Sequence, residues 1–174
     1  DMIYSGNGSD EVLSFIFYAF FDSSKKFVMP EFTYSFYPVY AGYYDIPMDL
    51  VPLNEDWSLN MDEMVNRAKE NKSGIIFANP NAPTGLILSL SDIEKIVKSN
   101  PRNVVIIDEA YIDFGGESAV PLIKKYDNLL VTQTFSKSRS MAGARLGFGI
   151  GSAALMQDLK TIKYSTNPYN INSM

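Results

Sequence analysis

The sequence contains no cysteine and no histidine among its 174 residues. Without cysteine the chain can form no disulfide and no thiolate metal site, and a reducing compartment is compatible with it. Without histidine it lacks the most common general base and metal ligand. Any acid–base chemistry therefore has to use lysine, tyrosine or carboxyl side chains.

The chain also lacks a long basic block and a long apolar run. Its net charge of −5 argues against a nucleic-acid partner. The apolar stretch VLSFIFYAFF at 12–21 is too short to span a membrane, and no signal-peptide pattern is present. We therefore expect a cytoplasmic protein without a membrane partner. A hydrophobic content of 46% over this length fits one domain with a sizeable core.

Short β-rich runs alternate with amphipathic segments, without an internal repeat. The order predicts a three-layer α/β/α fold with a mostly parallel sheet. We expect strands within 3–7, 25–30, 49–53, 73–80, 102–114, 128–136 and 144–151, and helices within 9–21, 34–44, 61–72 and 89–100. Ser9, with acidic residues after it, is placed to cap the first helix, and Ser91 with Glu94 fits a capping pair. Both termini resemble cuts through a larger protein, so we expect a fragment.

Polar clusters follow four of the predicted strands, where ligands bind in open α/β sheets. These clusters are GNGSDE at 6–11, NPNAPTG at 79–85, DEAY at 108–111 and TFSK at 134–137. The first can form an anion site at a helix start, although an ordinary capped turn has the same pattern. In the second, Asn81 could be held toward a ligand by the prolines, or the segment could be only a rigid turn.

The third and fourth clusters carry the more specific chemistry. Asp108 ends a buried strand and needs a partner there, such as a protonated ring nitrogen, with Tyr111 as a nearby donor. An Asp–Glu metal pair or a capping role are alternatives, and we rank a metal below an organic cation. Lys137 could form a Schiff base, with Arg145 lowering its pKa. Ser136 and Arg145, together with Thr134, suit a phosphate dianion, although most lysines are simply solvated.

Together the four clusters meet the needs of one ligand, pyridoxal 5'-phosphate. They also carry a resemblance over essentially the whole chain. NPNAPTG, DEAYIDF, TFSKSRSMAGARLGF and GNGSDE resemble the large domain of fold-type I aminotransferases, and within these the histidinol-phosphate aminotransferase family. The resemblance implies transamination between histidinol phosphate and 2-oxoglutarate in histidine biosynthesis. It also implies a homodimer, and a chain, 1–174, that is inactive without its N-terminal arm and C-terminal small domain.

The resemblance implies a role for each matching residue. Lys137 would carry the cofactor and shuttle the proton, Asp108 would pair with the pyridine nitrogen, and Tyr111 would bond the phenolate oxygen. Further cofactor contacts and one substrate contact are implied for Ser9, Asp10, Tyr34, Thr134, Ser136, Arg145 and, on the substrate side, Asn170. One position departs from the pattern, because Ala82 stands where many relatives have asparagine. Asn81 is therefore expected either to replace that contact or to leave it unmade.

Three other functions remain compatible with these motifs. One is a threonine-phosphate decarboxylase of the same fold, although TFSK followed by SRSMAGARLGF favours the aminotransferase. Another is an aminotransferase for a different amino acid, such as an aromatic one. The third is a cofactor-sensing domain of a transcriptional regulator, which would carry its DNA-binding segment upstream.

Overall fold

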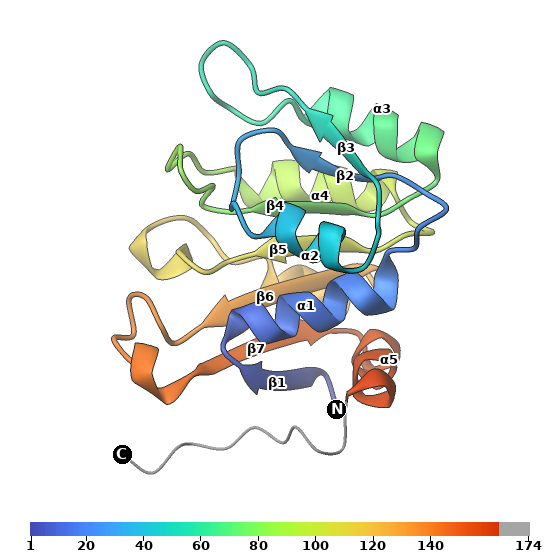
Figure 1. Ribbon diagram of the computed structural model, residues 1–174. Coiled ribbons are helices and arrows are strands. Elements are labelled where there is room, and N and C mark those ends of the chain that lie inside the picture. The colour runs from blue at the N-terminus through green and yellow to red at the C-terminus, as the bar shows by residue number, and fades with distance from the viewer. Residues whose placement is uncertain (164–174) are drawn as a thin grey trace.

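The computed structural model describes residues 1–163, which form a seven-stranded sheet with helices on both faces (Figure 1). The strands are β1 (Ile3–Asn7), β2 (Phe27–Pro30), β3 (Met48–Val51), β4 (Ile75–Ala78), β5 (Val105–Asp108), β6 (Leu129–Thr134) and β7 (Leu146–Gly151). The helices are α1 (Ser9–Phe20), α2 (Tyr37–Tyr43), α3 (Met61–Asn71), α4 (Leu90–Ser99) and α5 (Ala153–Ile162). Short 3-10 turns lie at η1 (Ile112–Phe114), η2 (Val120–Lys124) and η3 (Ala142–Ala144).

The strand order is β1-β7-β6-β5-β4-β2-β3. The strands from β3 across to β6 pair in parallel, whereas β7 runs antiparallel to both β6 and β1. The predicted three-layer fold with a mostly parallel sheet is therefore confirmed. The parallel strands end along one edge, which brings together segments that are far apart in the sequence.

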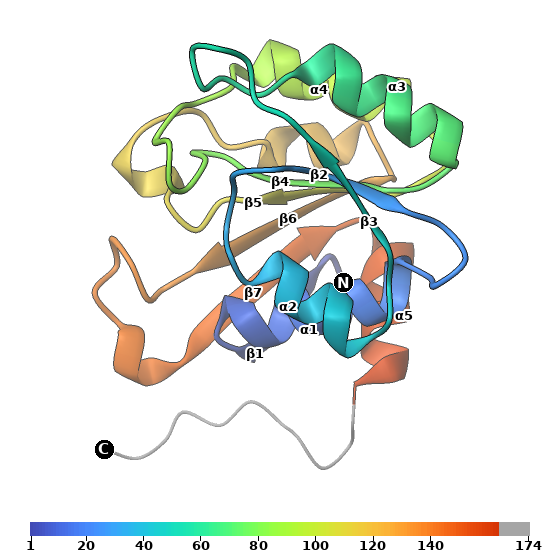
Figure 2. The same ribbon diagram turned by 45° about the horizontal axis from the view of Figure 1, so that its top comes forward.

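Alternating side chains of the central strands pack into two separate cores. Ile76, Ile106 and Leu130 pack with α1, α2 and α5, whereas Phe77 and Ile107 pack with α3 and α4. Figure 2 separates these helices above and below the sheet. Because side chains alternate along a strand, each residue that follows the apolar run is assigned to one face by its position alone.

Two helix starts differ from the prediction. Gly8, with a φ of 85°, occupies the N-cap of α1, and Ser9 is already the first helical residue. The carboxylate of Glu11 instead accepts a hydrogen bond of 2.7 Å from the backbone N–H of Asn7. The cap of α4 is Ser89, whose hydroxyl accepts from the N–H of Asp92, rather than the predicted pair two residues later. Helix α5, capped by a serine, was not predicted.

The predicted partner in that pair, Glu94, has another contact. It accepts a hydrogen bond of 2.6 Å from the hydroxyl of Tyr126. Short-range capping signals at 89–94 were therefore ambiguous, because Ser89 and Ser91 are both followed by an acidic residue three positions later.

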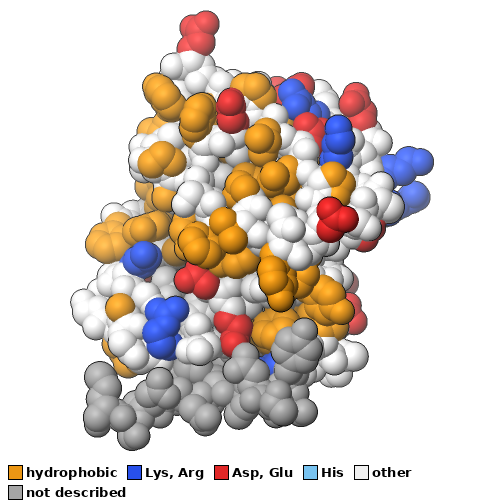
Figure 3. Space-filling view, in the orientation of Figure 1, with side chains coloured by type: hydrophobic (Ala, Val, Ile, Leu, Met, Phe, Trp, Pro, Cys, Tyr) orange, Lys and Arg blue, Asp and Glu red, His pale blue; other side chains and the backbone are white. Residues whose placement is uncertain are grey.

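The surface over α2 carries several exposed apolar side chains. Phe36, Val39 and Tyr43 are 45%, 53% and 80% exposed. Figure 3 shows hydrophobic side chains gathered across the middle of this face. Within residues 1–163, no helix combines the length and the apolar character that crossing a membrane would require.

Candidate functional site

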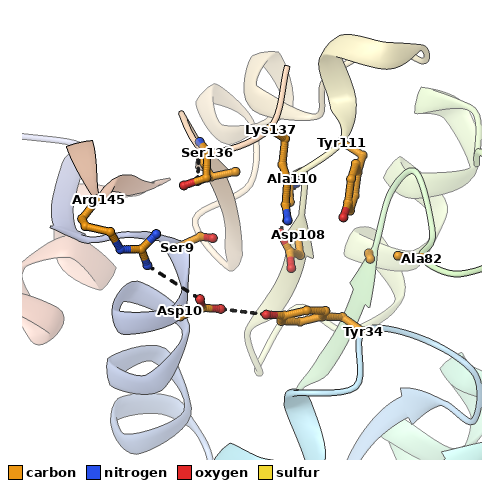
Figure 4. A pocket seen from close by; sticks show the side chains of 12 residues that line it. Ser9, Asp10, Tyr34, Ala82, Asp108, Ala110, Tyr111, Ser136, Lys137 and Arg145 are labelled. Atoms are coloured by element: carbon orange, nitrogen blue, oxygen red, sulfur yellow. Dashed lines mark hydrogen bonds and ion pairs between the residues drawn. The ribbon is translucent and has the colours of Figure 1, made fainter. Parts of the chain in front are cut away.

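A pocket lies at the carboxyl ends of β4, β5 and β6, beside the start of α1 (Figure 4). Three of the four polar clusters identified in the sequence contribute most of its side chains, and the fourth contributes Ala82. The lining residues are Ser9, Asp10, Tyr34, Ala78, Ala82, Asp108, Ala110, Tyr111, Thr134, Ser136, Lys137 and Arg145. The structure therefore brings together nine of the site residues predicted from the sequence, namely Tyr34 and eight others: Ser9, Asp10, Asp108, Tyr111, Thr134, Ser136, Lys137 and Arg145.

Asp108 forms the floor of the pocket and is only 4% exposed. Its Oδ2 accepts 2.9 Å from the hydroxyl of Tyr37, and its Oδ1 accepts 3.2 Å from Thr132 and 3.1 Å from the N–H of Ala110. Burial raises the pKa of Asp108, although these hydrogen bonds oppose the rise. A cation inside the pocket would favour its charged form.

Glu109 points to the opposite face of the sheet and does not reach the pocket. It is 1% exposed and accepts hydrogen bonds from the hydroxyl of Ser118 at 2.7 Å, the N–H of Ala119 at 2.6 Å and the amide of Gln133 at 2.8 Å. Burial raises its pKa as well. An Asp–Glu metal pair is therefore excluded for Asp108 and Glu109. Between residues 1 and 163, no group of three or more potential metal-ligating side chains gathers.

Lys137 and Tyr111 enter the pocket from two neighbouring loops. The Nζ of Lys137 lies 5.3 Å from the centre of the Tyr111 ring. In Figure 4 the polar ends of both side chains are directed toward Asp108. The amine, the phenol and the buried carboxylate can therefore all contact one small ligand.

The opposite end of the pocket combines a guanidinium group with backbone donors. The Nη2 of Arg145 lies 4.0 Å from the Oδ2 of Asp10. Thr134 turns its hydroxyl toward the loop and accepts 3.1 Å from the N–H of Ser136. The start of α1 leaves backbone N–H groups without helical partners, and these favour an anion.

Two glycines allow this end of the pocket to form. A Cβ on Gly8 would lie 2.5 Å from the Nη2 of Arg145. A Cβ on Gly147, in β7, would clash with the backbone of Gly8 and Ser9. Gly147 therefore lets β7 approach the loop that precedes α1, because only a residue without a side chain fits there.

Tyr34 lies across the pocket from Lys137 and is fixed by its hydroxyl. It donates a hydrogen bond of 2.9 Å to the Oδ1 of Asp10, which also accepts 3.1 Å from Tyr40. Burial, and then the hydrogen bond to Asp10, raise the pKa of Tyr34 well above its usual value. The ring is therefore a neutral, oriented wall of the pocket.

Asn81 does not join the residues that line this pocket. Its amide nitrogen donates 3.0 Å hydrogen bonds to the carbonyl of Phe32 and to the hydroxyl of Thr84, and the residue is 3% exposed. It lines a separate, more open groove with Ile87. Ala82, not Asn81, lines the pocket, which favours the second of the two expectations, that the asparagine contact is left unmade. Asn170 lies outside the described residues.

Three residues that hold the pocket side chains in place, Thr132, Tyr37 and Tyr40, were not predicted from the sequence. Thr132 was detectable, because it stands two residues before Thr134 on one strand face and pairs in register with Asp108. Tyr37 and Tyr40 had no such signal. Their segment is rich in aromatic residues, and only the packing of α2 selects which hydroxyls reach the carboxylates.

The fold and the pocket define a three-layer α/β protein with a pocket beyond the carboxyl ends of its strands, and the start of α1 and Arg145 give that pocket an end suited to an anion. The chain belongs to the aminotransferase class I and II family, because that family's model matches residues 1–168. It is 53% identical over 174 residues to the histidinol-phosphate aminotransferase of Lactococcus lactis subsp. cremoris, an alignment that covers 100% of this chain and 48% of that protein. The chain thus spans about half the length of the curated relatives it matches.

Solved structures show the same fold. The histidinol-phosphate aminotransferase from Clostridium acetobutylicum superposes with a TM-score of 0.85 at 28% identity, covering 98% of this chain and 50% of that one. The enzyme of the same name from Sinorhizobium meliloti, solved in complex with pyridoxal-5'-phosphate, has a TM-score of 0.88 at 21% identity and covers 97% of this chain and 47% of that one.

Proposed function

We propose that residues 1–174 form the cofactor-binding large domain of a pyridoxal-phosphate-dependent aminotransferase. The observation that carries the proposal is the convergence of Lys137, Asp108 and Arg145 on one pocket. An amine, a buried carboxylate and a guanidinium at three sides of one cavity match the aldehyde, the ring nitrogen and the phosphate of that cofactor. Family membership supports the same proposal.

The residues present fit this group at both ends. Asp108 is a buried carboxylate whose hydrogen-bond donors leave it without a positively charged partner among the contacts described for it. At the other end, the start of α1 lies close to Arg145, and an added Cβ at Gly8 would collide with the Arg145 guanidinium. Ser9, Ser136 and Arg145 would hold the phosphate, with Thr134 beside them, and the Tyr34 ring would cover one face.

Each pocket residue then has a distinct chemical task. When bound, pyridoxal phosphate supplies an aldehyde for the amino group and a ring that accepts the electron pair left by proton removal. The carboxylate of Asp108 would hold a proton on the ring nitrogen, and the hydroxyl of Tyr111 would orient the ring oxygen. The Nζ of Lys137 would hold the cofactor at its aldehyde and, when free, would move the proton at the substrate α-carbon.

We infer histidinol phosphate as the amino donor and 2-oxoglutarate as the acceptor, with glutamate as product, in histidine biosynthesis. The 53% identity to a relative of that name supports this assignment. We further propose a cytoplasmic homodimer, with the remaining contacts to substrate supplied by segments outside this chain. Residues 1–174 alone are then expected to show no turnover.

Replacement of Lys137 by alanine in the full-length protein tests the proposed cofactor site. We expect loss of the visible absorption band of lysine-bound cofactor, and a fall in turnover of at least about 10³-fold, because both covalent attachment and proton transfer depend on this amine. Lys125→Ala is the matched control, since Lys125 lies 3.8 Å from Glu94 and outside the pocket. If the absorption band remained in Lys137→Ala, the cofactor would be attached to a different lysine, and the proposed role of Lys137 would be wrong.

A substrate comparison on the full-length protein tests the reaction. We expect glutamate to form from 2-oxoglutarate with histidinol phosphate, faster than with aromatic amino acids. Release of carbon dioxide from threonine phosphate without glutamate formation would contradict transamination and indicate a decarboxylase.

A further inference from the structure

The loop that carries Lys137 is bound to the loop that carries Tyr111 through one carboxylate outside the pocket. Asp113 lies two residues after Tyr111, in η1. Its Oδ2 accepts a short hydrogen bond from the hydroxyl of Ser138 and one of 2.9 Å from the Nε of Arg139, and its Oδ1 accepts 3.2 Å from the Nη2 of Arg139. The two residues that follow Lys137 are therefore both bound to the segment that follows Tyr111.

Arg139 is in turn held on three further sides. Its Nη2 donates 3.0 Å to the Oε1 of Gln133, whose amide nitrogen donates to the buried carboxylate of Glu109. Its guanidinium carbon lies 5.0 Å from the ring centre of Phe135 and 5.8 Å from that of Phe148. A planar guanidinium can make the two-pronged contact with a carboxylate while stacking on aromatic rings, which a lysine cannot do.

The loop that contains Lys137 is also held by backbone hydrogen bonds within the loop itself. The N–H of Ser140 donates 3.0 Å to the carbonyl of Lys137, and the N–H of Met141 donates 2.9 Å to the carbonyl of Phe135. The Lys137 side chain itself is exposed, and the contact described for it is the Tyr111 ring. Its position therefore depends on the backbone of its loop.

We propose that Asp113 and Arg139 are positioning residues that hold the amine of Lys137 over Tyr111 and in line with Asp108. This proposal rests on the proposed function. It goes further by placing the control of the reactive amine in a polar network on the outer side of the loop, from Asp113 through Arg139 and Gln133 to Glu109.

Asp113→Asn in the full-length protein tests the network, because it keeps the side-chain shape and removes the charge that Arg139 contacts. We expect kcat to fall by about 10- to 10²-fold with KM changed less than about threefold, since small displacements of a catalytic group slow the chemical step. The pH midpoint of the lysine-bound cofactor band should shift as well. Arg139→Lys keeps the charge but not the two-pronged geometry, and should give a loss of the same kind.

Asp49→Asn is the matched control. Asp49 binds Arg67 at 2.8 Å, and the side-chain exposures of that pair, 29% for Arg67 and 20% for Asp49, resemble the 29% and 34% of Arg139 and Asp113. That pair joins β3 to α3, away from the pocket. The control should leave kcat and the cofactor band as in the unmodified protein.

Hydrogen exchange on the cofactor-free protein separates this proposal from the proposed function. Asp113→Asn should accelerate exchange at the amides of Ser140 and Met141, and Asp49→Asn should not. Ser138→Ala, which retains the ion pair, should give a smaller acceleration and guards against a folding defect in Asp113→Asn. Unchanged exchange and kcat in Asp113→Asn, or equal losses in the control, would overturn the network. Failure to bind pyridoxal phosphate at Lys137 would overturn the proposed function alone.

Discussion

Two neighbouring carboxylates on opposite faces of the sheet have different surroundings. Asp108 and Glu109 are consecutive, both buried, and both have a pKa raised by burial. Asp108 faces the pocket beside α1 and α2, whereas Glu109 faces η2 and is bound by a hydroxyl, a backbone N–H and an amide. The first carboxylate is directed at a space for a ligand, and the second joins structural elements. Strand alternation alone separates the ligand-binding role from the structural one.

The largest expected difference between the two carboxylates is in catalysis, when each is replaced by its neutral amide. We expect Asp108→Asn in the full-length protein to lower kcat/KM by roughly 10²- to 10³-fold, because a neutral amide cannot hold a proton on the ring nitrogen. Glu109→Gln should lower it by less than about tenfold, since Glu109 has no pocket contact and reaches the Lys137 loop only through Gln133 and Arg139. Steady-state kinetics, with circular dichroism to verify folding, measures both. Equal losses in the two variants would show that the faces do not differ in function.

Glu109→Gln should instead act on stability. An amide in place of the carboxylate leaves at least one of the three donors without an acceptor, which costs about 1–3 kcal/mol for a buried group. Urea unfolding of the cofactor-free protein measures this loss. A variant as stable as the unmodified protein would show that the network around Glu109 is not needed for folding.

On the pocket side of the sheet, two glycines of β7, Gly147 and Gly149, differ in the space available for a side chain. Gly147→Ala should cost about 1–3 kcal/mol and weaken pyridoxal phosphate binding, because its Cβ would press on the backbone of Gly8 and Ser9. Gly149→Ala is the control, since its Cβ would lie 3.4 Å from Val12, an ordinary contact. Thermal unfolding and cofactor titration measure both effects. If Gly147→Ala binds the cofactor as tightly as Gly149→Ala, close approach of β7 is not required at the anion end.

The smallest expected effect is on the pH dependence of stability without cofactor. A carboxyl group whose pKa is raised on folding adds stability below its unfolded pKa, and that stability is lost as pH rises through the folded pKa. Asp108 is in this class because of burial. The unmodified protein should therefore lose stability relative to Asp108→Asn as pH rises above the unfolded pKa of about 4. Urea unfolding across this range measures the difference.

Asp49 provides a control of opposite sign. Burial raises its pKa, but hydrogen bonds from Arg67 and Asn71 outweigh burial and leave the pKa below its usual value. The stability that Asp49 contributes is present above its unfolded pKa and lost as pH falls through the folded one. The difference between the unmodified protein and Asp49→Asn should therefore grow with pH. Parallel trends for the two aspartates would contradict their assigned environments.

Much of the fold was readable from local patterns. Each of the seven strands overlaps a segment predicted to contain one, because apolar runs bounded by glycine, proline or polar residues are a local signal. The cap of α4 and helix α5 were not predicted correctly. Both depend on choices among similar residues, such as Ser89 and Ser91, that packing of the helix on the sheet resolves.

The sequence by itself determined the chemistry of the pocket, since the residue types at the strand ends name an amine, a carboxylate and a guanidinium. Only the tertiary structure decided which of them meet. It placed Asp108 inside and Glu109 outside, directed Asn81 away and brought Tyr37 to Asp108 across 71 positions. The physical reason is that side-chain type is local, whereas contact depends on strand register and helix packing, which join residues distant in sequence.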